Sequence, residues 1–200
     1  MFWSSPAWDS VVYWSLDLET GGFDPRRDPI VSVGMVPVES GVIRLGEGWE
    51  SLVRPALGGA ISEASIQAHQ LVPEEVREAP PLPEVLAQIE RRMRDSVLLV
   101  HHASIDVRFL RHAFQECRMR WPRPHVVDTV DLLLKLVKKE RFTNPDARDG
   151  DPVLNLAAAR SRLGLPVYQS HDALTDAVSA AELFLVLRRR LAARTLRDLR

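Results

Sequence analysis

Five side chains in this sequence have the types and spacing of a hydrolytic centre. They lie in three short segments: Asp17 and Glu19 in Ser-Leu-Asp-Leu-Glu-Thr, Asp106 in His-His-Ala-Ser-Ile-Asp, and His171 with Asp176 in His-Asp-Ala-Leu-Thr-Asp. Four converging carboxylates repel one another unless cations lie between them, and oxygen-rich sites suit Mg²⁺ or Mn²⁺. A histidine adds a group that titrates near neutral pH. This combination indicates metal-assisted hydrolysis of a phosphodiester.

The first two acids are two positions apart on an expected strand. Asp17 and Glu19 therefore share one face of it, and Leu18 points to the other face. The alternative is a strand end whose acids are only solvated. The preceding apolar run is typical of an interior strand, where unpaired charge is costly. A bound metal ion removes that cost.

The third acid, Asp106, falls in the first turn of an expected helix, just after a buried strand. The alternative is an acid favoured only by the helix dipole. The position is informative because ligands of open α/β sheets gather where strands end and helices begin. His101 and His102 precede it. Histidines at such positions pack or form hydrogen bonds more often than they bind metal, so we assign neither to the metal.

The last segment enters the final long helix. Asp176 lies at the edge of that helix's inner face, and His171 lies five residues earlier, in the entering loop. From there His171 can reach over a metal site and take a proton from the attacking water as general base. The alternative is an ordinary loop histidine beside an N-cap residue, Asp172.

Alternating strands and helices are expected to position these residues. Strands are expected at residues 11–16, 30–38, 41–53 and 97–100, the first three as an antiparallel meander. Helices are expected at residues 82–94, from an N-cap at Ser104 with Ile105 on the inner face, at 128–138, 154–163 and 173–195. Residues 1–10 are expected to be a loose lead-in, with packing of Trp3 and Trp8 against the body as the alternative. Residues 57–83 are expected to be irregular with one short helix, and 140–152 a loop. This order predicts a single α/β domain with a mixed sheet.

Bulk properties agree with one soluble domain. The chain has 200 residues, 46% of them hydrophobic and 26% charged. A net charge of −1 excludes a protein that coats nucleic acid, but a local basic rim can still guide a polyanion. The arginines from Arg188 onward are read as a solvated helix end or, alternatively, as phosphate contacts. The lone Cys117 excludes an internal disulfide and a cysteine zinc cage. Without an apolar membrane span or a basic leader, we expect a cytoplasmic location and no membrane contact.

Residues 17–20, 102–106 and 171–176 together resemble a known family. Their order and the five-residue His–Asp spacing are similar to the three sequence blocks of the DEDDh 3′→5′ exonucleases. That group includes the proofreading subunit of bacterial DNA polymerase III, RNase T and oligoribonuclease. The resemblance covers about residues 11–190. It implies an α/β, RNase H-like fold with a five-stranded mixed sheet flanked by helices.

The resemblance also assigns roles to the residues of the site. It implies that two divalent ions, Mg²⁺ or Mn²⁺, are held by Asp17, Glu19, Asp106 and Asp176. It implies that His171 is the general base.

Four further positions are implied to face the substrate. These are Leu18, Thr20, His69 and His102. The sequence departs from the family pattern near them: Gln70 replaces the usual Gly after His69, and Gly21 stands where Thr is common. His102 and Ile105 stand where Asn and Phe are common, which alters the stacking contact expected at the second of these positions.

The expected activity is removal of nucleoside 5′-monophosphates from the 3′ ends of single-stranded DNA or RNA. The expected partners are that 3′ end and the nucleotide product, with a homodimer or a polymerase association as further possibilities. The alternative from another class is a catalytically idle module that binds nucleic acid or takes part in a polymerase assembly on the same fold.

Overall fold

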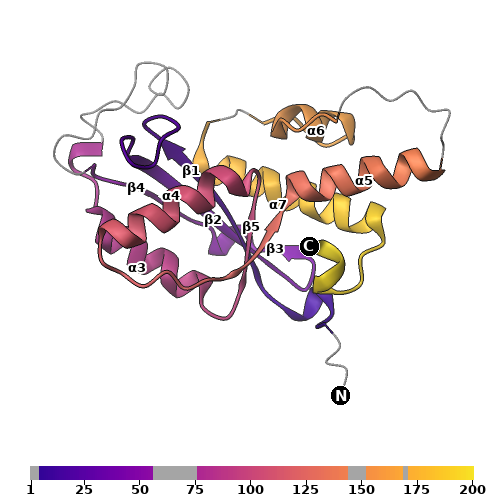
Figure 1. The fold of residues 1–200 in the computed structure, drawn as a ribbon, viewed down its shortest axis with the longest axis horizontal. Coiled ribbons are helices and arrows are strands. Elements are labelled where there is room, and N and C mark those ends of the chain that lie inside the picture. Colours follow the sequence, from indigo (N-terminus) through magenta and orange to yellow (C-terminus); the bar gives the residue numbers. More distant parts are fainter. Residues whose placement is uncertain (1–4, 56–75, 144–151, 169–170) are drawn as a thin grey trace.

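The computed structural model of the chain describes residues 5–55, 76–143, 152–168 and 171–200, and its centre is a mixed sheet (Figure 1). Its six strands are β1 (Tyr13–Thr20), β2 (Ile30–Glu39), β3 (Val42–Ile43), β4 (Trp49–Leu52), β5 (Val97–Val100) and β6 (His125–Asp128). The order is β3-β2-β1-β5-β6, and β4 also pairs with β2. Strands β1, β5 and β6 are parallel, whereas β2 is antiparallel to β1 and to both β3 and β4. The carboxyl ends of β1, β5 and β6 therefore meet at one edge.

Helices cover both faces of this sheet, as Figure 1 shows. The α-helices of the described part are α3 (Leu82–Met93), α4 (Ala103–Glu116), α5 (Thr129–Thr143), α6 (Leu156–Arg162) and α7 (Ala173–Leu191). Helices α3 and α4 pack on one face, and α5, α6 and α7 contribute to the core on the other. No helix in the described ranges is both long and apolar enough to cross a membrane.

The alternation of side chains along β1 decides which face each residue serves. Tyr13 packs on Phe184 of α7, with ring centroids 4.8 Å apart, and the hydroxyl of Ser15 donates to the carbonyl of Ala177 at 2.7 Å. Leu16 and Leu18 instead enter the core beneath α3 and α4. The period of two therefore turns the odd-numbered residues of β1 toward α7.

Two features of the sheet differ from the prediction. The strand expected at 41–53 is interrupted by the 3₁₀ turn η2 (Leu45–Glu47), which separates β3 from β4. The prediction missed β6, a four-residue strand that follows a Pro-containing stretch. Such a short apolar run carries little periodicity by itself. The sheet therefore has six strands where five were expected.

The helix boundaries and the amino-terminal segment also need correction. Helix α4 begins at Ala103, before the expected N-cap Ser104, and α5 continues to Thr143. The last helix ends at Leu191 and a 3₁₀ turn, η3 (Leu196–Leu199), follows it. Residues 5–10, expected to be loose, include the 3₁₀ turn η1 (Trp8–Ser10), whose Trp8 amide donates to the carbonyl of Arg194 at 3.0 Å. This segment is thus tied to the carboxyl-terminal residues.

Candidate active site

The carboxyl end of β1 carries the first two acids. Asp17 and Glu19 follow Tyr13 and Ser15 on the face that α7 covers, as the period of two predicts. Asp17 pairs with Gly34 of β2. A Cβ atom at Gly34 would lie 2.2 Å from the backbone at the start of α7, so the absent side chain lets this helix approach the sheet. That close approach brings the start of α7 to the acids of β1.

A turn at the end of β5 places Asp106. His102 adopts a left-handed conformation, with φ of 72°, and α4 begins directly after it. The carboxylate of Asp128, at the end of β6, accepts hydrogen bonds from the amides of His102 at 3.1 Å and Ala103 at 2.8 Å. It also accepts one from Val130 at 2.9 Å, which caps α5. The first of these roles joins residues 25 and 26 positions apart in the chain.

The start of α7 places Asp176 and His171. The side chain of Asp172 caps the helix by accepting from the Thr175 amide at 2.7 Å. The carboxylate of Asp176 accepts from the amide of His171 at 2.8 Å, and His171 has a positive φ of 70°. A non-glycine residue in this region is strained and persists only where its surroundings hold it. The hydrogen bond to Asp176 therefore ties the proposed base to a proposed metal ligand.

The three segments converge on one place. One ligand atom from each of Glu19, His171 and Asp176 lies within 4.8 Å of the other two. Asp17 adjoins them, since the charges of Asp106, Glu19 and Asp176 all raise its pKa. The four carboxylates and the histidine all line one pocket.

The electrostatics of this pocket favour cations. Burial is the main cause of the raised pKa values of all four carboxyl groups, and neighbouring carboxylates raise them further. The pKa of Glu19 rises to about 7, and the pKa values of Asp17 and Asp106 lie well above 3.8. Carboxylate oxygens with a nearby imidazole suit hard divalent ions. The residues present therefore fit a divalent metal site.

The two histidines before α4 have different surroundings. His101 is buried, and its Nε2 lies 2.7 Å from the carbonyl oxygen of Leu154, so this nitrogen carries the proton and donates. Its Nδ1 lies 2.7 Å from the hydroxyl of Thr129. Burial lowers the pKa of His101 to about 4, so the ring is neutral. Both nitrogens are occupied by protein groups, which leaves His101 no position for a metal ion.

The acids line a pocket of about 450 Å³, called here the catalytic pocket. Leu18, Thr20 and His102, the substrate-side positions implied by the resemblance, line it. The hydroxyl of Thr20 is already engaged, because it donates to the carbonyl of Gly22 at 2.7 Å. His69 lies outside the described residues.

Phe23 and Ile105 add apolar surface to the catalytic pocket. Phe23 lines it with 86% of its surface exposed. Ile105, which was expected on the inner face of α4, also lines it and is 37% exposed. The expected burial of Ile105 was wrong because this residue lies in the first turn of α4, beyond the core that covers Phe109 and Ala113 on the same side of the helix. In the sequence, the only signal for this position of Phe23 is that it follows Gly21 and Gly22 directly after β1.

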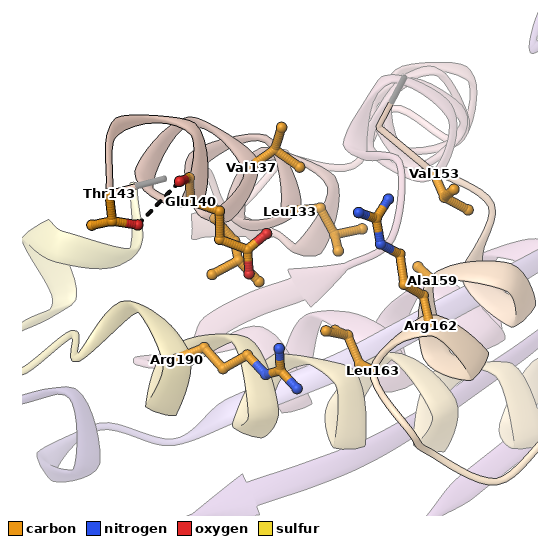
Figure 2. A pocket seen from close by; sticks show the side chains of 10 residues that line it. Leu133, Val137, Glu140, Thr143, Val153, Ala159, Arg162, Leu163 and Arg190 are labelled. Carbon is orange, nitrogen blue, oxygen red and sulfur yellow. Dashed lines mark hydrogen bonds between the residues drawn. The ribbon is translucent and has the colours of Figure 1, made fainter. Parts of the chain in front are cut away.

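A second hollow lies away from the acids, between α5, α6 and α7 (Figure 2). It measures about 340 Å³ and is lined largely by aliphatic side chains, with Glu140, Arg162 and Arg190 around them. Glu140 is the only acidic residue among those that line this hollow. The catalytic pocket is therefore the candidate site.

Comparison with known sequences identifies the family. A profile of the exonuclease family that is represented by RNase T matches residues 15–184, and the chain therefore belongs to this family, within the DnaQ-like 3′→5′ exonuclease superfamily. The family predicted from the three motifs is thus confirmed.

Several curated proteins are similar to the chain over most of its length. It is 33% identical over 191 residues to a DNA polymerase III subunit epsilon-like protein of Rhodobacter capsulatus, covering 94% of this chain and 25% of that protein. It is 29% identical over 171 residues to a PolC-type DNA polymerase III of Thermotoga maritima, covering 85% of this chain and 11% of that protein. The chain thus spans only a tenth to a quarter of the length of these relatives.

Solved structures share the fold. Exonuclease I of E. coli in complex with a dT13 oligonucleotide superposes with a TM-score of 0.76 at 18% identity, over 91% of this chain and 42% of that one. The cell-death related nuclease CRN-4 gives a TM-score of 0.73 at 13% identity, over 92% of this chain and 64% of that one. At these identities the likeness concerns the fold, and it confirms the predicted RNase H-like α/β architecture.

Proposed function

We propose that this chain is a divalent-metal-dependent exonuclease that removes nucleoside 5′-monophosphates from the 3′ end of single-stranded nucleic acid. The observation that carries the proposal is the convergence of four carboxylates with raised pKa values and one histidine in the catalytic pocket. The family supports the reaction type. The oligonucleotide in the E. coli exonuclease I complex supports single-stranded DNA as the first substrate to test.

The acids divide into two neighbouring groups that would hold the metal. Asp106 is buried, and its charge raises the pKa of Asp17, while burial and the charges of Asp128 and Glu19 raise the pKa of Asp106. Glu19 and Asp176 lie beside the exposed His171. Bound divalent ions would lower the pKa of the attacking water and stabilise charge on the phosphate.

His171 is the group placed to take the proton of the attacking water. Its ring is exposed, and one ring nitrogen lies within 4.8 Å of carboxylate oxygens of both Glu19 and Asp176. General-base removal typically costs on the order of 10²–10⁴ in rate. The bond between phosphorus and the 3′ oxygen breaks, which leaves a shortened strand with a 3′ hydroxyl and a free 5′-monophosphate.

Phe23 and Ile105, two of the apolar residues that line the catalytic pocket, suit the terminal bases. Phe23 presents its ring to solvent, and Ile105 faces the same space. An exposed aromatic ring can stack on any base, which is worth about 1–3 kcal/mol per base. The departure from the family pattern at Ile105 leaves Phe23 as the aromatic contact of the described pocket.

The adjacent surface is suited to the phosphates of the incoming strand. A smaller hollow of about 240 Å³, called here the basic pocket, is lined by Arg26, Arg27, Arg54 and His112, which outnumber its two acids, Asp28 and Glu116. It lies on the other side of the loop that carries Phe23, along α4. In the described part of the chain, the three arginines form no ion pair. In this proposal, the nucleic-acid strand that leads to the 3′ end crosses this loop.

The experiment is cleavage of 3′-labelled and 5′-labelled oligonucleotides by purified protein with Mn²⁺. Loss of the 3′ label as mononucleotide, with progressive shortening of the 5′-labelled strand, supports the proposal, and intact substrate rejects it. Asp176→Ala is the negative control for a contaminating nuclease. Matched DNA and RNA oligonucleotides decide which sugar is preferred. Calorimetric titration with Mn²⁺ excludes the catalytically idle alternative if it finds a tight divalent site.

A further inference from the structure

A buried cation joins α6 to α7 behind the catalytic pocket. Arg160, in α6, is 1% exposed. Its guanidinium donates to the carbonyl of Ser179 in α7 at 2.6 Å, to the carbonyl of Pro166 at 2.9 Å and to the carboxylate of Glu182 at 2.7 Å. An isolated buried charge is costly, so such a group is kept only where several partners hold it.

The same ion pair also holds Tyr168. The tyrosine hydroxyl donates to the other carboxylate oxygen of Glu182 at 3.1 Å. The guanidinium carbon of Arg160 lies 4.6 Å from the centre of the tyrosine ring, within the range of a cation–π contact. Tyr168 is therefore fixed by its ring and by its hydroxyl, although it is 37% exposed.

Tyr168 precedes His171 by three positions. Three residues of extended chain reach about 11 Å at most, so the position of Tyr168 limits where His171 can lie. On the other side, His171 is held by the hydrogen bond from its amide to Asp176. The base therefore lies between two anchors, one on Glu182 and one on Asp176, both in α7.

We propose that Arg160, Glu182 and Tyr168 form a positioning unit that holds the segment bearing His171 over the acidic residues. This inference rests on the proposed role of His171 as the base. The strained backbone of His171 needs such external support, because a positive φ is unfavourable for an unsupported loop residue. Loss of the Tyr168 anchor lets the imidazole leave the water that it must deprotonate.

The test is a double-mutant cycle with Tyr168→Ala and His171→Ala. Misplacing a catalytic group by about 1 Å costs roughly 10²-fold, so we expect Tyr168→Ala to lower kcat roughly 10- to 100-fold with KM within about 2-fold. In the His171→Ala background the same change should have no further effect. An equal fractional loss in both backgrounds, or a loss of Mn²⁺ affinity, overturns the proposal, because Tyr168 would then act on the fold or on the metal ligands.

Two matched variants separate the contacts of the unit. Tyr168→Phe keeps the ring beside Arg160 and loses only the hydroxyl contact, so its kcat should fall less than that of Tyr168→Ala. Arg160→Met removes both the ion pair and the ring contact. It should reproduce the kcat loss of Tyr168→Ala wherever circular dichroism shows a folded protein.

A readout without activity keeps this inference separate from the proposed function. The ring signals of His171 in a ¹H–¹³C spectrum can be assigned among six histidines by their disappearance in His171→Ala. We expect one sharp signal in the wild-type chain and a shifted or broadened signal in Tyr168→Ala. An unchanged signal overturns the proposal. A changed signal in a protein that cleaves no oligonucleotide supports the positioning unit while rejecting the nuclease activity.

Discussion

Gly34 lies directly opposite Asp17 in the antiparallel ladder between β1 and β2. A side chain at Gly34 would collide with the backbone of Ala173 and Leu174, the first residues of α7. The glycine thus allows the helix that carries Asp176 to lie against the strand that carries Asp17. The spacing of the acids depends on this contact between two backbones.

Gly34→Ala should therefore move α7 and separate the acids. Overpacking of this kind typically costs about 1–3 kcal/mol of stability. We expect a lower unfolding temperature together with weaker Mn²⁺ binding in calorimetric titration. Gly46→Ala is the matched control, since an added Cβ there meets nothing within 4 Å. Unchanged Mn²⁺ affinity in Gly34→Ala would show that the acids tolerate the displacement.

His171→Ala should separate proton transfer from metal binding. We expect Mn²⁺ affinity to persist and kcat to fall on the order of 10²–10⁴-fold. Asp176→Asn should lose both Mn²⁺ affinity and cleavage, although the side-chain oxygen of Asn can still accept the hydrogen bond from the His171 amide. Titration calorimetry and single-turnover cleavage measure the two quantities. If His171→Ala also abolishes Mn²⁺ binding, the imidazole is a metal ligand.

The stability of the metal-free protein should fall as the pH rises from 6.5 to 8.5. The pKa of Glu19 is about 7 in the folded chain against 4.5 ordinarily, so the native state binds more protons and the resulting stabilisation is lost as the pH rises from 4.5 through 7. Asp17 and Asp106 act in the same direction. His101 acts in the opposite direction, but only between its folded pKa of about 4 and its ordinary 6.5.

Thermal unfolding in EDTA measures this effect. Glu19 alone contributes about 1 kcal/mol over the window, because one pKa unit corresponds to about 1.4 kcal/mol. Glu19→Gln should reduce the pH dependence, and Mn²⁺ should stabilise the wild-type chain most at pH 8.5, where the carboxyl groups are most ionised. A stability that rises with pH in EDTA would contradict the raised pKa values.

Phe23→Ala should weaken substrate binding. Loss of one stacking contact worth about 1–3 kcal/mol predicts a rise in KM of roughly 10-fold or more for an oligonucleotide. Phe142→Ala is a matched control, since Phe142 is 87% exposed and lies in α5 outside the catalytic pocket. Equal effects of the two substitutions would remove Phe23 from the substrate site.

The arginines of the basic pocket should determine how strongly oligonucleotide binding depends on salt concentration. Each phosphate contact with a single strand contributes about −0.7 to the slope of log affinity against log salt concentration. Replacing Arg26 and Arg27 by Ala should therefore flatten the slope and weaken binding of a long oligonucleotide more than that of a dinucleotide. Arg189→Ala, on the exposed side of α7, is the control. A larger loss of oligonucleotide affinity with Arg189→Ala would show that the nucleic-acid strand binds along α7 instead.

Much of the secondary structure could be predicted, because it depends on residues that are close together in the sequence. The alternation along β1 places Asp17 and Glu19 on one face, and the apolar spacing of residues 82–94 indicates α3. Motif order alone was enough for the family. The missed β6 is short, and Asp128, at the end of that strand, stabilises the turn before α4. Such features depend on partners distant in the chain.

The sequence by itself determined which side chains are available for chemistry, because residue types and local periodicity can be recognised within short segments. Only the tertiary structure decided that Asp17, Asp106 and Asp176 share one pocket and that Arg160 reaches the segment before His171. These distances depend on how closely α7 approaches β1 and on how Asp128 holds the start of α4. Both are set by packing between elements that lie far apart in the chain, which no local pattern records.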